Sequence, residues 1–137
     1  MTYQIVLADD QPLVRHCVRG ILTGSTDLEV VAEAGNGIDL LELLCGEDIT
    51  PDLVIVDISM PRLDGIEAIR RIKTLHPGIK SLILTGHKDV AYVARAFTVG
   101  AAGYLVKETA DSELLTAIKT IREGGTYLSS CLADEEA

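Results

Sequence analysis

The stretch Leu53-Val54-Ile55-Val56-Asp57, followed by Ile58-Ser59-Met60-Pro61-Arg62-Leu63-Asp64-Gly65, decides how the rest of the chain is interpreted. Four consecutive apolar residues, three of them β-branched, predict a strand buried on both faces, as strands of a parallel sheet are. The strand ends on the carboxylate of Asp57. Ligands of open α/β sheets lie beyond the carboxyl ends of the strands, so Asp57 is either a site residue or an ordinary turn cap.

Length and composition indicate one domain with an aliphatic core. The chain has 137 residues, 47% of them hydrophobic, with one Phe and no Trp. The net charge of −9 argues against direct contact of this chain with nucleic acid or an anionic membrane. No apolar run is long enough to span a bilayer, and the N-terminus lacks the basic region of a signal peptide, so we expect a cytoplasmic protein.

Three cysteines, Cys17, Cys45 and Cys131, are far apart in the sequence and form no C-x-x-C spacing. Their odd number and their spacing fit neither a disulfide framework nor a zinc site. Cys17 and Cys45 fall in helical patterns, so we expect both to be small core residues, whereas Cys131 lies in the C-terminal tail.

Apolar runs that predict strands alternate with helical patterns along the chain. The strands are expected at residues 4–8, 28–34, 53–56, 81–84 and 102–106. Four helices are expected between residues 12 and 24, 38 and 45, 64 and 76, and 90 and 100, and a last helix uses Leu114, Ala117, Ile118 and Ile121 and ends at Gly124-Gly125. This alternation predicts a doubly wound, flavodoxin-like α/β domain. Its five-stranded parallel sheet has the order 2-1-3-4-5, with helices on both faces.

Finer features of these elements are also predicted. Asn36 is a candidate cap of the second helix, and Asp64 with Glu67 resembles a capping box for the third. Val90, Val93, Ala94 and Phe97 are expected to form the buried face of the fourth. Residues 1–125 make up the domain, and residues 126–137, which turn acidic, are expected to be a frayed tail or the start of a linker.

Four of the predicted strands end in polar residues at the same edge of the sheet. In chain order these residues are Asp9-Asp10, Asp57, Thr85 and Lys107. Three neighbouring carboxylates repel one another unless a cation lies between them, and Mg²⁺ is the ion that carboxylates and a phosphate commonly share. Asp57 would then be a nucleophile toward phosphorus. Lys107, Thr85 and the N–H of Gly86 would face the phosphoryl oxygens.

Each of these residues also has a simpler interpretation. Lys107 can be a strand-end lysine that reaches solvent, Thr85 an ordinary β-branched strand residue, and Asp9-Asp10 a solvated helix N-terminus. Their coincidence at one edge favours a common site.

The ordered pattern Asp9-Asp10, Asp57-x-x-Met60-Pro61-x-x-Asp64-Gly65, Thr85-Gly86 and Tyr104-x-x-Lys107 resembles the receiver domain of bacterial two-component response regulators. The resemblance covers residues 4–124. It implies that Asp57 accepts a phosphoryl group from a sensor histidine kinase. The protein would then be a phosphoacceptor that assists its own phosphorylation and dephosphorylation, and not an enzyme in the ordinary sense.

The resemblance also implies roles for the residues around Asp57. Mg²⁺ would be held by Asp10, Asp57 and the backbone carbonyl of Ser59, with Asp9 contributing through a water molecule. Thr85 and Lys107 would contact the phosphoryl group. Tyr104 would be an aromatic switch that turns inward as Thr85 moves.

Two segments, residues 9–15 and 103–108, resemble the NarL/FixJ type of regulator. Glu108 stands where many receivers have Pro, so a trans bond is expected after Lys107. Such proteins carry a helix-turn-helix DNA-binding domain after the receiver, and DNA would be contacted only through that domain, which this chain lacks. An excised receiver and a stand-alone receiver that acts by protein contacts both remain open. A homodimer formed on phosphorylation fits the partly apolar outer faces of the first, fourth and fifth helices.

Two other function classes remain open. An Asp-nucleophile phosphatase usually needs a second Asp two residues after the nucleophile, where this chain has Ser59. A binding module would dock partners without phosphorylation. Ser59 and His87, two residues beyond Asp57 and Thr85, are candidates for controlling water access and the lifetime of the aspartyl-phosphate; otherwise His87 is an exposed helix start.

Overall fold

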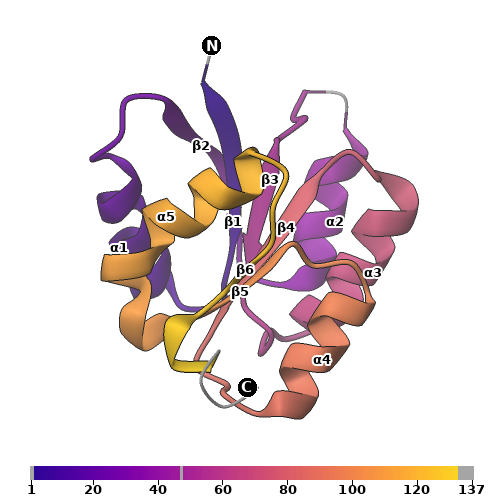
Figure 1. Ribbon diagram of the computed structural model, residues 1–137. Helices are drawn as coiled ribbons and strands as arrows, with labels where there is room; N and C mark the ends of the chain where they lie inside the picture. Colours follow the sequence, from indigo (N-terminus) through magenta and orange to yellow (C-terminus); the bar gives the residue numbers. More distant parts are fainter. Residues whose placement is uncertain (1, 47, 133–137) are drawn as a thin grey trace.

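The computed structural model describes residues 2–46 and 48–132. At its centre is a parallel sheet of six strands in the order β2-β1-β3-β4-β5-β6, with helices on both faces (Figure 1). The predicted α/β class and the order of the first five strands are confirmed. The described residues form six strands, not the five expected from the sequence.

The strands are β1 (Tyr3–Ala8), β2 (Leu28–Ala34), β3 (Leu53–Val56), β4 (Lys80–Thr85), β5 (Gly103–Val106) and β6 (Tyr127–Leu128). The helices are α1 (Pro12–Leu22), α2 (Gly37–Cys45), α3 (Gly65–Leu75), α4 (Val90–Thr98) and α5 (Ala110–Arg122), with a short 3-10 helix η1 (Lys107–Thr109) before α5. Figure 1 shows α1 and α5 on one face of the sheet and α2, α3 and α4 on the other. None of the described helices is long and apolar enough to cross a membrane.

Strand β3 is buried on both faces, as its composition predicts. Leu53 and Ile55 belong to the apolar cluster under α1 and α5, whereas Val54 and Val56 belong to the cluster under α2, α3 and α4. All four side chains are at most 3% exposed. This strand therefore joins the two halves of the core and holds Asp57 at a rigid position.

Two of the predicted helix caps are present. The Asn36 side chain accepts a hydrogen bond from the N–H of Asp39 at 2.8 Å at the start of α2. The Asp64 carboxylate accepts one from the N–H of Glu67 at 2.9 Å at the start of α3. The Glu67 carboxylate itself accepts from Arg70, so the structure shows the first half of the expected capping box.

Two predictions about burial are wrong. Cys17 and Cys45 are exposed, because they lie on the outer sides of α1 and α2. In α4 the fully buried residues are Val93 and Ala96. Val90, expected on the buried face, is 52% exposed, and Ala94 is exposed as well. The helical spacing was recognised correctly, but the rotation of these helices about their axes was not.

The sixth strand lies in the segment that was expected to be a tail. Tyr127 and Leu128 pair in parallel with Gly103 and Tyr104 of β5. A run of two residues carries no detectable alternation, so its sequence does not predict a strand. Residues 133–137 lie outside the described residues, so the linker interpretation of that part stays a prediction.

Candidate functional site

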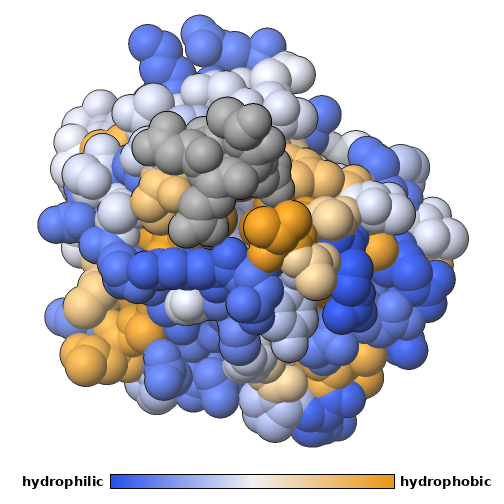
Figure 2. Space-filling view, turned by 60° about the horizontal axis from the view of Figure 1, so that its bottom comes forward, coloured by the Kyte–Doolittle hydropathy of each residue, from blue (hydrophilic) through white to orange (hydrophobic). Residues whose placement is uncertain are grey.

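The carboxyl ends of β1, β3, β4 and β5 meet around one open pocket. The register pairs Ala8 with Val56 and Thr85 with Val106, so the residues that follow these strands are brought close together. The lining residues are Asp10, Gln11, Asp57, Ser59, Thr85, Gly86, His87 and Lys107. The bottom of the molecule in Figure 1 comes forward in Figure 2, which shows mostly hydrophilic side chains there with apolar patches between them.

Lys107 joins two carboxylates in this pocket. Its Nζ lies 3.0 Å from Oδ2 of Asp57 and 3.0 Å from Oδ2 of Asp9. It also donates to Oε1 of Gln11 at 3.4 Å. Asp9 and Asp57 are each only 5% exposed, so water solvates these carboxylates poorly. The half-buried ammonium of Lys107 compensates by placing a positive charge beside them.

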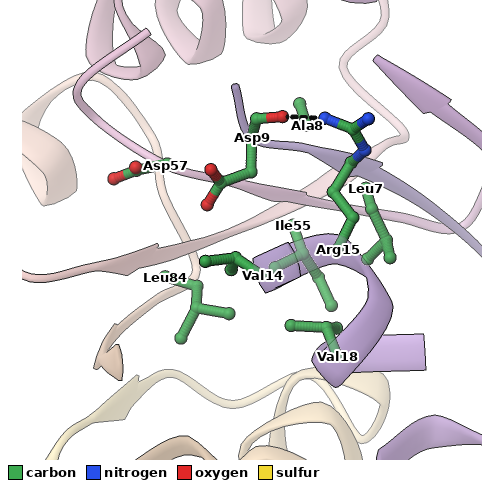
Figure 3. A pocket seen from close by; sticks show the side chains of 9 residues that line it. All are labelled: Leu7, Ala8, Asp9, Val14, Arg15, Val18, Ile55, Asp57 and Leu84. Atoms are coloured by element: carbon green, nitrogen blue, oxygen red, sulfur yellow. Dashed lines mark hydrogen bonds between the residues drawn. The ribbon is translucent and has the colours of Figure 1, made fainter. Parts of the chain in front are cut away.

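The electrostatics follow from this burial. Burial lowers the pKa of Lys107, but its hydrogen bonds and charge interactions with Asp57 and Asp9 outweigh that effect and raise the pKa overall. Burial raises the pKa of Asp9, although the N–H of Gln11 and the ammonium of Lys107 favour its charged form. The cause is visible in Figure 3, where apolar side chains from β1, α1, β3 and β4 form a wall beside the two carboxylates.

The pocket fits a divalent cation. Carboxylate oxygens of Asp9, Asp10 and Asp57 lie within 4.8 Å of one another. Within residues 2–46 and 48–132, Oδ1 of Asp57 is the one buried side-chain oxygen or nitrogen without a hydrogen-bond partner. Buried polar atoms are normally paired, so the orphaned oxygen shows that the Asp57 carboxylate has room for a further ligand. Together the three acidic groups suit a hard cation such as Mg²⁺.

The loop after β3 is shaped by a close backbone approach. A Cβ atom on Gly65 would lie 2.1 Å from the carbonyl oxygen of Asp57, so this position accepts no side chain. The Gly65 N–H donates to the carbonyl of Ile58 at 2.9 Å, and Arg62 adopts φ 69° to turn the loop. These contacts hold the backbone of Asp57 against the start of α3.

Thr85, Tyr104 and Ser59 are linked through His87. The Thr85 hydroxyl accepts from the N–H of His87 at 3.4 Å, and the Tyr104 hydroxyl donates to the His87 carbonyl at 2.8 Å. The His87 ring contacts the Ser59 hydroxyl, with Nε2 and Oγ 2.6 Å apart. Tyr104 is fully buried, so its ring points inward, and burial with the nearby charges of Asp89 and Asp57 raises the pKa of its hydroxyl.

The structure thus brings together Asp9, Asp10, Asp57, Thr85 and Lys107. The hydroxyl of Ser59 reaches the mouth of the pocket, and a Cβ on Gly86 would meet no protein atom within 4 Å, because that position faces open space. His87 is half-buried and hydrogen-bonded, so its interpretation as a merely exposed helix start is wrong.

Three contributors were not singled out from the sequence. Gln11 contacts Lys107, and its position directly after the two aspartates was the available signal. Gly65 was noted in the motif without a role. Arg15 donates to the backbone carbonyl of Asp9 and pairs with Glu33 at 2.8 Å, as the dashed line to Asp9 in Figure 3 shows in part. No sequence pattern predicts that contact.

The family model "Response regulator receiver domain" matches residues 5–119, and the chain belongs to this family. The predicted family is therefore confirmed. The chain is 39% identical to the transcriptional regulatory protein DegU of Brevibacillus brevis over 125 residues, which cover 91% of this chain and 52% of DegU. It is 35% identical to the virulence regulator BvgA of Bordetella pertussis over 135 residues, covering 98% of this chain and 63% of BvgA. The chain thus spans about half to two thirds of the length of these relatives.

Solved structures show the same fold. A two-component response regulator of the LuxR family from Aurantimonas sp. SI85-9A1 superposes with a TM-score of 0.92 at 36% identity, covering 98% of this chain and 95% of that one. The isolated REC domain of RcsB from Salmonella enterica, solved with the phosphomimetic BeF3−, gives a TM-score of 0.89 at 25% identity and covers 98% of both chains. Relatives that are transcriptional regulators and a LuxR-family neighbour agree with the predicted NarL/FixJ type.

Proposed function

We infer that Asp57 accepts a phosphoryl group from a phosphohistidine of a sensor kinase, and that this transfer changes the conformation of the receiver. One observation carries this proposal. Oδ1 of Asp57 has no hydrogen-bond partner within the described part of the chain, while Oδ2 is held by Lys107 at 3.0 Å. The carboxylate is therefore oriented by one oxygen and available for chemistry through the other.

The step balances as a simple displacement. Oδ1 of Asp57 supplies an electron pair to phosphorus, the bond between phosphorus and the kinase imidazole breaks, and its electron pair remains on the nitrogen. Lys107 holds the carboxylate in place through Oδ2 and sets a positive charge beside the incoming phosphoryl group. Asp10, Asp57 and the Ser59 carbonyl, with Asp9 through water, would hold Mg²⁺, and the ion would supply positive charge against the phosphoryl oxygens.

The conformational response would begin at Thr85. Its hydroxyl and the N–H of Gly86 would donate to the phosphoryl oxygens, and Tyr104 would fill the space that Thr85 leaves. Tyr104 already bonds to the carbonyl of His87, so its inward position connects the pocket to the loop before α4. The population of the switched state can rise only as far as these contacts differ between the two states.

The proposed output is transcription. DegU and BvgA are transcriptional regulators, and this chain spans 52% and 63% of their lengths. We propose that a DNA-binding domain outside this chain reads the state of Asp57, with homodimer formation on phosphorylation as the intermediate step. A stand-alone receiver that acts through protein contacts is the alternative, and it predicts that the full-length protein does not bind DNA.

Labelling with a small phosphodonor such as acetyl phosphate tests the proposal. With Mg²⁺ present, intact-mass analysis should show one phosphoryl group on the wild type and none on Asp57→Asn, and chelation of Mg²⁺ should abolish labelling. Asp111→Asn, an exposed carboxylate on α5, is the matched control and should label normally. An unlabelled wild type would favour a binding module, and multiple turnovers of a phosphomonoester would favour a phosphatase.

A further inference from the structure

The chain beyond α5 returns to the sheet and packs against it. Residues 127–132, named here the C-terminal strap, include β6 and the residues directly after it. The N–H of Tyr127 donates to the carbonyl of Ala102 at 3.0 Å, and the N–H of Ser129 donates to the carbonyl of Tyr104 at 2.9 Å. Figure 1 shows this segment running beside β5 and passing between α4 and α5.

The strap is bonded to the part of β5 that carries the site residues. The hydroxyl of Ser129, which is fully buried, accepts a hydrogen bond from the N–H of Val106 at 2.9 Å. Val106 directly precedes Lys107. Ser129 is therefore hydrogen-bonded to the backbone of Tyr104 and of Val106. Strand β5 positions two site residues, Tyr104 and Lys107, and Ser129 bonds at or next to both of them.

A buried carboxylate on α5 fastens the strap. Glu113 is 8% exposed and accepts hydrogen bonds from the hydroxyl of Tyr127 and from the N–H of Ser130 at 3.1 Å. The Ser130 hydroxyl donates to the second oxygen of Glu113 at 3.3 Å. A carboxylate with both oxygens bonded to one segment is a specific anchor for that segment.

The apolar end of the strap packs in the cluster that also contains the proposed switch residue. Leu132 is 2% exposed and lies in the same apolar cluster as Tyr104, Val93 and Ala96. If the Tyr104 ring turned outward, it would leave a cavity in this cluster, and filling or tolerating that cavity costs free energy. The docked strap and the inward Tyr104 therefore stabilise each other.

We propose that the C-terminal strap is a coupling element, which transmits the state of the Asp57 pocket to whatever follows residue 132. The inference rests on the proposed function, because it takes the inward Tyr104 as the form that binds a phosphoryl group best. Coupling of this kind is reciprocal. A ligand at Asp57 must tighten the strap, and loosening the strap must weaken binding of that ligand by the same factor.

The first test uses the wild-type protein and needs no variant. Hydrogen exchange of the amides of Tyr127, Ser129 and Ser130 is measured with and without beryllofluoride and Mg²⁺. We expect exchange to slow by about fivefold or more, the lower end of typical allosteric coupling. Amides of β2, at the opposite edge of the sheet, serve as the internal reference and should not change.

The second test measures the reciprocal effect. Leu132→Ala should weaken beryllofluoride affinity by about fivefold or more, whereas Leu115→Ala, at a 42% exposed position on α5, should leave it unchanged. Ser129→Ala with Ser112→Ala as its control is a second pair, in which less packing is lost and folding is better preserved.

The outcomes separate the two proposals. If beryllofluoride binds but strap exchange stays the same, the strap is a structural element only and the coupling is refuted. The same holds if Leu132→Ala and Ser129→Ala speed strap exchange without changing beryllofluoride affinity. If beryllofluoride does not bind the wild type at all, the proposed function fails, and the coupling fails with it.

Discussion

Asp57 and Glu113 are both buried carboxylates, but the protein treats them in opposite ways. Glu113 has hydrogen bonds on both oxygens, from Tyr127 and Ser130, and it fastens one segment to another. Asp57 has one oxygen held by Lys107 and one without a partner within residues 2–46 and 48–132. Burial alone therefore does not mark a reactive carboxylate. A reactive carboxylate is marked by an oxygen that has no hydrogen-bond partner and faces a pocket lined by other charged groups.

The largest expected effect comes from removing the partner that holds Asp57. Lys107→Met removes an ammonium 3.0 Å from both Asp57 and Asp9, so phosphorylation by acetyl phosphate should slow by about 100-fold, a typical cost of losing one electrostatic contact in a site. Mg²⁺ affinity should rise in the same variant, because the acidic cluster becomes more negative.

Both quantities can be measured on one protein sample, by mass spectrometry and by calorimetric titration with Mg²⁺. Lys119→Met, at an exposed position on α5, is the control for loss of a lysine. Weaker Mg²⁺ binding in Lys107→Met would contradict the expectation that removal of this positive charge strengthens cation binding.

The next effect concerns the anchor. Glu113→Gln replaces charge-assisted hydrogen bonds by neutral ones and leaves a buried amide with a mismatched donor, so the free energy of unfolding should fall by about 1–3 kcal/mol in urea titration. Glu123→Gln, an exposed carboxylate, should change it by less than about 0.5 kcal/mol. Equal stability of the two variants would show that the charge of Glu113 contributes nothing to the anchoring of the strap.

The pH dependence of stability should differ in sign for the two carboxylate regions. Burial raises the pKa of Glu113, but the hydrogen bonds from Tyr127, Thr109 and Ser130 lower it below its ordinary 4.5 overall. Its stabilising contribution is therefore complete above the unfolded value and disappears as the pH falls through the lower folded pKa. Burial with the hydrogen bond to Glu113 raises the pKa of Tyr127 to about 12, so this pair is unaffected at neutral pH.

Asp9 behaves in the opposite way. Its pKa is raised by burial above the ordinary 3.8, so the charged form destabilises the folded state at neutral pH, and this cost is relieved as the pH falls through the raised folded pKa. Unfolding free energies of Asp9→Asn and Glu113→Gln, each compared with the wild type across acidic pH, should converge on the wild type as the pH falls. At neutral pH, Asp9→Asn should be more stable than the wild type, and Glu113→Gln should be less stable.

The smallest expected effect concerns the mouth of the pocket. Ser59 and His87 contact each other at 2.6 Å beside Asp57, so removing either should change the access of water. We expect Ser59→Ala and His87→Ala to change the rate of aspartyl-phosphate hydrolysis by about two- to fivefold, the worth of one hydrogen bond. Ser112→Ala is the control, and unchanged rates in both variants would remove this role.

Much of the fold was predictable because its signals are local. Four apolar residues before Asp57 predict a doubly buried strand, and the alternation of such strands with helices implies the parallel order of the first five. The site followed from the same logic, since polar residues after parallel strands must meet at one edge. For this reason the sequence alone groups Asp10, Asp57, Thr85 and Lys107 at one site.

What the sequence could not supply depends on contacts between distant segments. Strand β6 forms because β5 offers an unpaired edge and Glu113 bonds Tyr127 and Ser130, and none of this is visible in a two-residue run. The exposure of Cys17, Cys45 and Val90 depends on how each helix rotates against the sheet. The sequence by itself determined the first five strands and the acidic edge, because hydrophobic periodicity and chain connectivity are encoded locally. Only the tertiary structure decided which carboxylate is left unsatisfied, because satisfaction of a buried oxygen depends on every segment packed around it.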